Sequence, residues 1–122
     1  MSKSFSNNMP IYVQIMDMIK LSISLGIYTP GQKVPSVRDL AIEYGVNPNT
    51  MQKALTKLEE QHLLYAERTS GRFVTKDADI IEDLKKEIPR KIIKVFLKDM
   101  QEAGIPTDTV IEHIQQYIIE NN

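Results

Sequence analysis

Apolar residues recur every three or four positions near the start of the chain, as they do on one face of an amphipathic helix. Pro10 suits the first turn of such a helix, and Gly26 suits its end. The stripe consists of Ile11, Val13, Ile15, Met18, Ile19, Ser22 and Ile23. We therefore predict one long helix here. The prolines of the next segment, residues 28–35, leave room only for a turn and a brief strand.

Two shorter helical patterns follow, and each begins with a residue that can cap a helix. Ser36 precedes Asp39 by three residues, which approximates a capping box, and this pattern ends near Gly45. Asn47 offers a cap oxygen directly before Pro48, which suits the first helical position. The inward-facing residues are Val37, Leu40 and Ala41 in the first helix and Met51, Ala54, Leu55 and Leu58 in the second. Two helices joined through a short glycine-containing turn predict a helix-turn-helix.

The second of these helices has a polar and mostly uncharged outer face. It carries Asn49, Thr50, Gln52, Lys53 and Thr56. In the major groove of DNA, Asn and Gln pair with adenine, Lys or Arg pairs with guanine, and a Thr methyl group can contact the thymine methyl. The face therefore favours DNA recognition. The alternative is a winged-helix module that binds protein without DNA, although a protein interface would be enriched in aromatic residues.

Residues 63–68 and 72–75 have the composition of two strands, and residues 69–71 that of a turn. Arg68 and Arg72 flank the glycine of this hairpin. A glycine tip can approach a phosphate or the minor groove closely, and the arginines would bind there. The pattern predicts the wing of a winged helix.

The last third of the chain predicts further amphipathic helices. Pro89 should kink the first of them or divide it in two, and Thr107 with Asp108 should cap the last. Helices of this size cannot bury their apolar faces alone, so we expect them to pack against the same helices of a second subunit and against the first helix. The residues expected in this interface are Ile81, Leu84, Ile88, Ile92, Val95, Phe96, Met100, Val110, Ile111, Ile114, Tyr117 and Ile118. A two-fold dimer places two recognition helices about one DNA turn, roughly 34 Å, apart, and so predicts a near-palindromic operator.

Charge is distributed unevenly along the 122 residues, although the net charge is only -1. Residues 1–76 hold nine Lys and Arg against six Asp and Glu, a net charge of +3, whereas residues 77–122 hold six against ten, a net charge of -4. A locally basic module of this kind can bind phosphates. The chain has no cysteine, which excludes disulfides and thiolate metal sites, and it shows no transmembrane run or signal segment. We expect a cytoplasmic protein.

Residues 9–76 resemble the DNA-binding domain of the GntR family of bacterial transcriptional regulators. The matching stretches are residues 10–15, Gly26 with Pro30 and Gly31, residues 34–41, residues 45–50 and residues 71–74. The short tail and the start of the first helix resemble the YtrA branch, whose members typically repress transporter operons. The resemblance implies that Arg38 binds a phosphate beside the half-site, that residues 47–53 enter the major groove and that residues 69–72 form the wing. The predicted DNA-binding residues are therefore Ser36, Arg38, Asn47, Pro48, Asn49, Thr50, Gln52, Lys53, Arg68, Thr69, Ser70, Gly71 and Arg72.

The chain departs from the family pattern at four positions. Pro48 and Gln52 replace arginines that some members carry, so the base preference of those members does not carry over. Thr69 replaces the first glycine of the usual wing turn. His62 replaces the glycine that usually ends the recognition helix, and we expect it to be a left-handed cap without a functional role.

Enzymatic and metal-binding functions find little support in the sequence. His62 and His113 lie on separate elements without cysteines, and the cluster of Asp77, Asp79, Glu82 and Asp83 is typical of a helix first turn. We expect no enzyme activity and no cofactor. Phe96, Met100, His113 and Tyr117 could line a pocket for a small-molecule effector, but apolar helical stripes are more often packed core.

These patterns together predict a mainly α fold with a small β-hairpin. Residues 9–77 would form a winged helix-turn-helix DNA-binding domain, and residues 78–122 a helical dimerisation module. The predicted function is that of a sequence-specific transcriptional regulator, a repressor that binds its operator as a homodimer and that could control a transporter operon.

Overall fold

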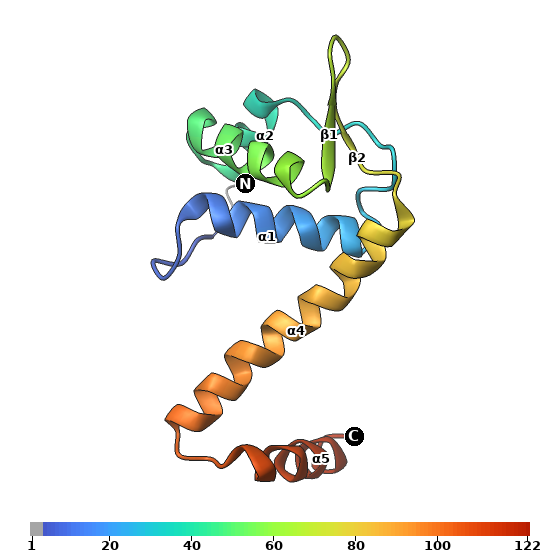
Figure 1. Ribbon diagram of the computed structural model, residues 1–122. Coiled ribbons are helices and arrows are strands. Elements are labelled where there is room, and N and C mark those ends of the chain that lie inside the picture. The colour runs from blue at the N-terminus through green and yellow to red at the C-terminus, as the bar shows by residue number, and fades with distance from the viewer. Residues whose placement is uncertain (1–3) are drawn as a thin grey trace. The chain divides into compact units, whose positions relative to one another are not determined.

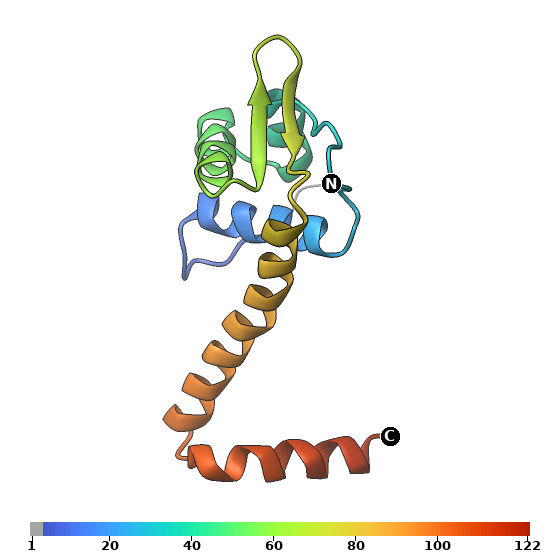
Figure 2. The same ribbon diagram turned by 45° about the vertical axis from the view of Figure 1, so that its right-hand side comes forward.

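The computed structural model describes residues 4–122 (Figures 1 and 2). Its contacts divide the chain between Lys85 and Lys86 into two compact units. The order of elements is three helices, a two-stranded antiparallel hairpin, a long helix, a 3-10 turn and a last helix. The predicted fold class is confirmed. Within residues 4–122, no helix is long and apolar enough to cross a membrane.

The core of the first unit lies among α1 (Ile11–Ser24), α2 (Val37–Tyr44) and α3 (Pro48–Glu60). Helix α3 packs against both α1 and α2. The largest fully buried side chains are Ile15, Ile19, Leu40, Met51, Leu55, Leu58, Leu64 and Val74. Each aliphatic side chain of this kind contributes about 1.5–3 kcal/mol by leaving water. The inward-facing residues predicted for α3 are all buried, as are Leu40 and Ala41 of α2.

Caps determine where α2 and α3 begin and end, as the sequence predicts. The Ser36 hydroxyl oxygen accepts a hydrogen bond from the Asp39 amide at 3.1 Å, and Gly45 ends α2 in the left-handed region with φ of 68°. The Asn47 side-chain oxygen accepts from the Asn49 amide at 2.7 Å, and Pro48 is the first residue of α3. Residues 45–47 are therefore the tight turn of a helix-turn-helix.

The hairpin consists of β1 (Leu64–Glu67) and β2 (Gly71–Val74), with Leu64 opposite Val74 and Glu67 opposite Gly71. Tyr65 and Phe73 stack across the strands, with their ring centroids 5.6 Å apart. Residues 31–34 run along the other edge of β2, where an isolated bridge joins Lys33 to Phe73. The brief strand predicted in residues 28–35 is thus reduced to a single bridge.

Tyr44 closes the buried side of α2, where it is 3% exposed. Burial first, and then the neighbouring Tyr28 and Glu43, together raise the pKa of its hydroxyl to about 12. The same causes, burial first and then Glu43, raise the pKa of Tyr28. Both phenols stay neutral at physiological pH, so this end of α2 carries no phenolate charge.

Helix α4 (Ala78–Glu102) begins at the acidic cluster, where the Asp77 carboxylate accepts from the Asp79 amide at 2.9 Å and from the Ile80 amide at 3.4 Å. This confirms the prediction for Asp77 and Asp79, which lie at the start of the helix, whereas Glu82 and Asp83 lie in its second turn. Among the described residues, no group of three or more His, Cys, Asp or Glu could hold a metal ion.

Of the two effects predicted for Pro89, a kink or a division of the helix, the division is wrong, because α4 is one helix through that position. Proline removes a single backbone donor, and the neighbouring turns of a long helix keep their own hydrogen bonds.

Helix α5 (Val110–Glu120) follows a 3-10 turn, η1 (Thr107–Thr109). The predicted cap by Thr107 and Asp108 is wrong, because both lie in this turn and α5 has no side-chain cap. The Thr107 hydroxyl instead accepts a hydrogen bond from the Gln101 amide at 3.1 Å, and Thr109 donates its hydroxyl to the Pro106 carbonyl at 2.7 Å.

His62 adopts φ of 63° directly after α3, which confirms the left-handed conformation expected from the sequence. A side chain in this region costs about 1–2 kcal/mol, whereas glycine adopts it without steric cost but loses more entropy on folding. We expect His62→Gly to stabilise the first unit by about 0.5–1 kcal/mol, as measured by urea unfolding.

Gln61→Gly is the matched control, because the neighbouring Gln61 has φ of -87° and gains nothing from glycine. It should destabilise the protein. Equal effects of the two substitutions would contradict a strained backbone at His62.

Candidate nucleic-acid interface

The outward face of α3 is polar because its other face is buried. Asn49, Gln52, Lys53 and Thr56 are exposed, and Thr50 is half-buried at the edge of the core. Asn47 and Pro48 lie exposed at the start of the helix, where they form its cap and first position. The predicted base-reading residues thus share one accessible surface.

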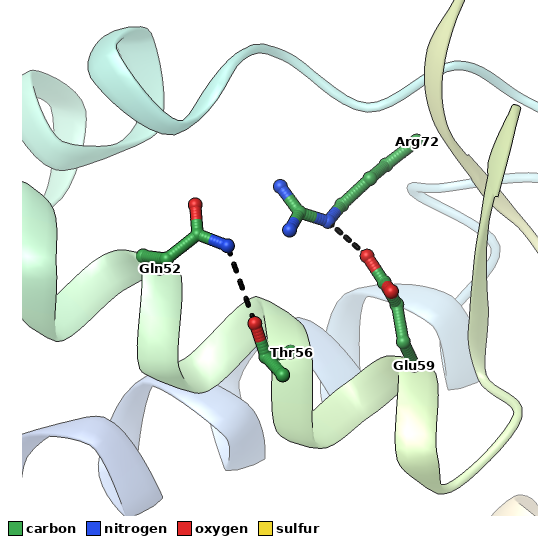
Figure 3. Close-up of polar contacts among 4 residues, drawn as sticks. All are labelled: Gln52, Thr56, Glu59 and Arg72. Carbon is green, nitrogen blue, oxygen red and sulfur yellow. Dashed lines mark hydrogen bonds and ion pairs between the residues drawn. The ribbon is translucent and has the colours of Figure 1, made fainter. Parts of the chain in front are cut away.

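Gln52 is held by its own helix. Its amide nitrogen donates to the Thr56 hydroxyl, one turn further along α3, at 3.2 Å (Figure 3). This hydrogen bond restricts the rotation of the amide before any ligand arrives. A side chain that is already oriented loses less entropy when it binds.

Lys53 is also positioned from within the first unit. Its ammonium nitrogen lies 4.1 Å from the centre of the Tyr12 ring, which belongs to the first turn of α1. A cation at this distance from an aromatic face gains about 0.5–1 kcal/mol at an exposed site. An open hollow of about 460 Å³ lies here, lined by Ile11, Tyr12, Asn49, Thr50 and Lys53. The first turn of α1 therefore borders the start of the recognition helix.

The wing separates its two arginines. Arg68 lies exposed in the loop with Thr69 and Ser70, and Gly71 begins β2 with φ of 111°. Arg72 is turned back from the hairpin, and its Nε donates to a Glu59 carboxylate oxygen of α3 (Figure 3). The side chains of Arg72 and Glu59 are only 20% and 29% exposed. Arg72 is therefore not a tip residue like Arg68 but part of the junction between wing and helix.

Ser36 and Arg38 lie at the start of α2, both exposed. Ser36 uses its oxygen as the cap acceptor and keeps its hydroxyl proton as a donor. Arg38 occupies the first turn. The DNA-binding residues predicted from the sequence thus come from α2, α3 and the wing of one compact unit.

Three residues of this surface do not appear in the sequence prediction. Tyr12 supports Lys53, Glu59 pairs with Arg72, and the Lys33 side chain lies against the wing, with its Cε 3.2 Å from where a Cβ on Gly71 would stand. The sequence shows their charge or aromatic character. Their partners lie too far along the chain for spacing rules to find them.

The tail presents apolar side chains to solvent. Ile92, Val95 and Ile111 are 64%, 61% and 64% exposed, and Phe96, Ile114, Tyr117 and Ile118 are also exposed. Ile93 and Ile119 are equally accessible, although the sequence prediction omits them. Ile81, Ile88 and Met100 are half-buried. Leu84 and Val110 are already covered within the single chain, so they have no surface left for a partner.

Comparison with known proteins adds a family match. Residues 11–74 match the bacterial regulatory proteins of the gntR family. The transcriptional regulator YhcF of Bacillus subtilis is 34% identical over 117 residues, covering 96% of this chain and 97% of that protein. The transcriptional repressor YtrA of the same organism is 32% identical over 108 residues, covering 88% of this chain and 83% of that protein.

Solved structures agree with these relatives. A GntR family transcriptional regulator from Listeria monocytogenes superposes with a TM-score of 0.80 at 36% identity, covering 92% of this chain and 98% of that chain. The DNA-binding domain of AraR, solved in complex with the operator ORE1, matches with a TM-score of 0.54 at 33% identity. That match covers 62% of this chain and 93% of the AraR chain.

Proposed function

The chain belongs to the GntR family of bacterial regulatory proteins, and from this premise we propose that it is a repressor that binds a near-palindromic operator as a homodimer. Members of this family are transcriptional regulators rather than enzymes, which confirms the sequence prediction on this point. The observation that carries the proposal is the exposed polar face of α3, mounted on a buried apolar face and flanked by a wing. The comparable domain of AraR was solved on operator DNA.

We divide the predicted DNA contacts by chemistry. Arg38 and the wing-loop residues Arg68, Thr69, Ser70 and Gly71 offer cationic, hydroxyl and backbone donors, which suit phosphates. Residues 47–53 offer amide, hydroxyl and ammonium groups on the exposed start of a helix, which suit base edges in the major groove. Ser36 adds its hydroxyl donor at the start of α2.

The homodimer is supported by the uncovered apolar side chains of the tail. Large apolar side chains exposed in this number favour an interaction site, and a second copy of the same chain carries the same set of side chains. The proposed interface includes Ile92, Val95, Phe96, Ile111, Ile114, Tyr117 and Ile118, with Ile81, Ile88 and Met100 at its edge. Leu84 and Val110 act in it only by supporting the helices from within.

Repression follows from occupancy of the operator, which would exclude RNA polymerase from the same DNA. The repressor named YtrA supports this reading by its similarity over most of this chain. Control of a transporter operon is the extension that the YtrA resemblance implies. Because bacterial DNA lies in the cytoplasm, we place the protein there.

A small-molecule effector stays a prediction. Phe96 and Tyr117, which could line its pocket, are 36% and 67% exposed in the single chain, and a dimer would cover them first. Effector binding would therefore compete with, or depend on, the proposed interface.

Selection of bound duplexes from a randomised library tests the proposal directly. We expect an inverted repeat whose half-site centres lie about 10 base pairs apart, because a two-fold dimer spaces its recognition helices by one DNA turn. Enrichment of single, unrepeated sites would contradict the dimeric mode, and no enrichment at all would contradict sequence-specific binding.

Arg38→Ala and Asn49→Ala should change DNA affinity in different ways. We compare affinity for the selected duplex with affinity for a scrambled duplex of the same length. The loss of a phosphate contact at Arg38 should weaken binding to both duplexes. It should also reduce the slope of log affinity against log salt concentration by about one unit. The loss of a base contact at Asn49 should cost about 1–3 kcal/mol on the selected duplex and little on the scrambled one. Each variant is the control for the other, and identical profiles in fluorescence titrations would refute the division of contacts.

Ile92→Glu and Ile118→Glu should each dissociate the dimer, because an unpaired carboxylate in an apolar interface must leave water. Ile42→Glu on α2 is the matched control, since Ile42 is 71% exposed but lies outside the tail. Light scattering should give monomers for the first two variants and a dimer for the control. Intact dimers in all three variants would contradict the proposed interface.

A further inference from the structure

The ion pair between Arg72 and Glu59 joins the wing to the recognition helix at a point that the proposed contacts do not use. Arg72 is the second residue of β2, and Glu59 lies in the last turn of α3, 13 residues earlier in the chain. The side chains are 20% and 29% exposed. Because both are largely covered, neither can reorient as freely as a surface side chain.

The pair leaves most of the arginine available. Glu59 accepts from Nε, whereas the two terminal nitrogens extend away from Glu59 and point toward Gln52 (Figure 3). An arginine carries five N–H donors, of which four belong to the terminal nitrogens. Gln52 is itself held by its hydrogen bond to Thr56. Two oriented polar groups, one from the wing and one from α3, therefore face the same side of the helix.

An unpaired carboxylate at Glu59 would repel the phosphates of DNA bound along α3. Pairing with Arg72 removes that repulsion. Glu60, the next residue, pairs instead with Lys57 at 3.6 Å, and these side chains are 55% and 46% exposed. The two acidic residues of the last turn thus have different partners. Glu60 pairs with an exposed lysine, whereas Glu59 pairs with a largely covered arginine that points along α3.

We propose that Glu59 is a positioning residue that makes Arg72 a base-reading group, directed at a guanine next to the base pair that Gln52 contacts. The proposal rests on the DNA-binding function proposed above. The paired terminal nitrogens of arginine match the O6 and N7 acceptors of guanine in the major groove. Arg68, exposed in the wing loop, is the phosphate-binding arginine of the hairpin.

The test compares binding to the duplex selected with the wild-type protein and to a scrambled duplex of the same length. The specificity ratio is the affinity for the first divided by the affinity for the second. Arg72→Ala and Glu59→Ala should each lower this ratio roughly 5- to 150-fold, the range of one bidentate base contact. Arg68→Ala should weaken both duplexes equally and leave the ratio unchanged.

Glu60→Ala is the matched control for Glu59→Ala, because each removes one negative charge and one ion pair from the same turn. It should leave the ratio unchanged. Glu59→Gln should restore part of it, since the amide oxygen still accepts from Nε. Once Arg72 is already alanine, Glu59→Ala should lower the ratio no further, and replacing the recognised guanine should affect wild type but not Arg72→Ala.

The possible results distinguish an error in the proposed DNA-binding function from an error in the roles proposed for Glu59 and Arg72. A wild-type protein that does not distinguish the two duplexes overturns the proposed function and this inference with it. A wild type that discriminates, with Glu59→Ala behaving like Glu60→Ala, overturns the inference alone. Equal losses on both duplexes in Arg72→Ala identify a phosphate contact and also overturn it. Should Glu59→Ala lower the thermal midpoint too far for titration, Glu59→Gln still loses the charge of the pair, and its specificity ratio should fall below that of Glu60→Gln.

Discussion

The packing of α3 against α1 and α2 is the constraint on which the rest of the first unit depends. Met51, Ala54, Leu55 and Leu58 are all 1% exposed or less, so the rotation of α3 about its axis is determined by its core face. A helix that buries one face must present the opposite one. The exposure of the amide, hydroxyl and ammonium groups on α3 is therefore a consequence of hydrophobic burial.

The first unit also orients the groups that this packing exposes. Thr56 holds Gln52, the Tyr12 ring lies beside the Lys53 ammonium, and Glu59 pairs with Arg72. The hydrogen bond of Gln52 and the cation–π contact of Lys53 each contribute on the order of 1 kcal/mol or less to stability. Their effect is to reduce the number of side-chain conformations before DNA arrives, which lowers the entropy cost of recognition.

The two ends of the chain have opposite charge, and this separates their roles. The basic residues gather in the helix-turn-helix and wing, whereas the acidic excess lies in α4, α5 and the segment before them. An acidic tail is repelled by phosphates, so the field of the molecule favours approach through its first unit. Most of the apolar residues that remain exposed on the tail belong to the interface proposed above.

Local rules were sufficient to predict most of the fold. Helical periodicity and the Ser36 and Asn47 caps act within four residues, so the sequence alone placed the helices, the turn between them and the hairpin. The left-handed His62 was predicted instead from the resemblance to the GntR family, in which a glycine usually stands at this position. The local rules were wrong in allowing Pro89 to divide α4, because a long helix tolerates a missing donor, and in making Thr107 a cap, because its hydroxyl accepts from Gln101 instead.

The tertiary structure alone decided which polar groups meet. Arg72 and Glu59 lie 13 residues apart on different elements, and Lys53 reaches a ring in α1, so neither pair leaves a periodic signature. Burial of Leu84 within one chain likewise depends on how distant segments pack. The sequence by itself determined that a polar recognition helix and a wing exist. Only the folded chain determined that Arg72 lies beside that helix, because packing brings together residues that are distant in the sequence.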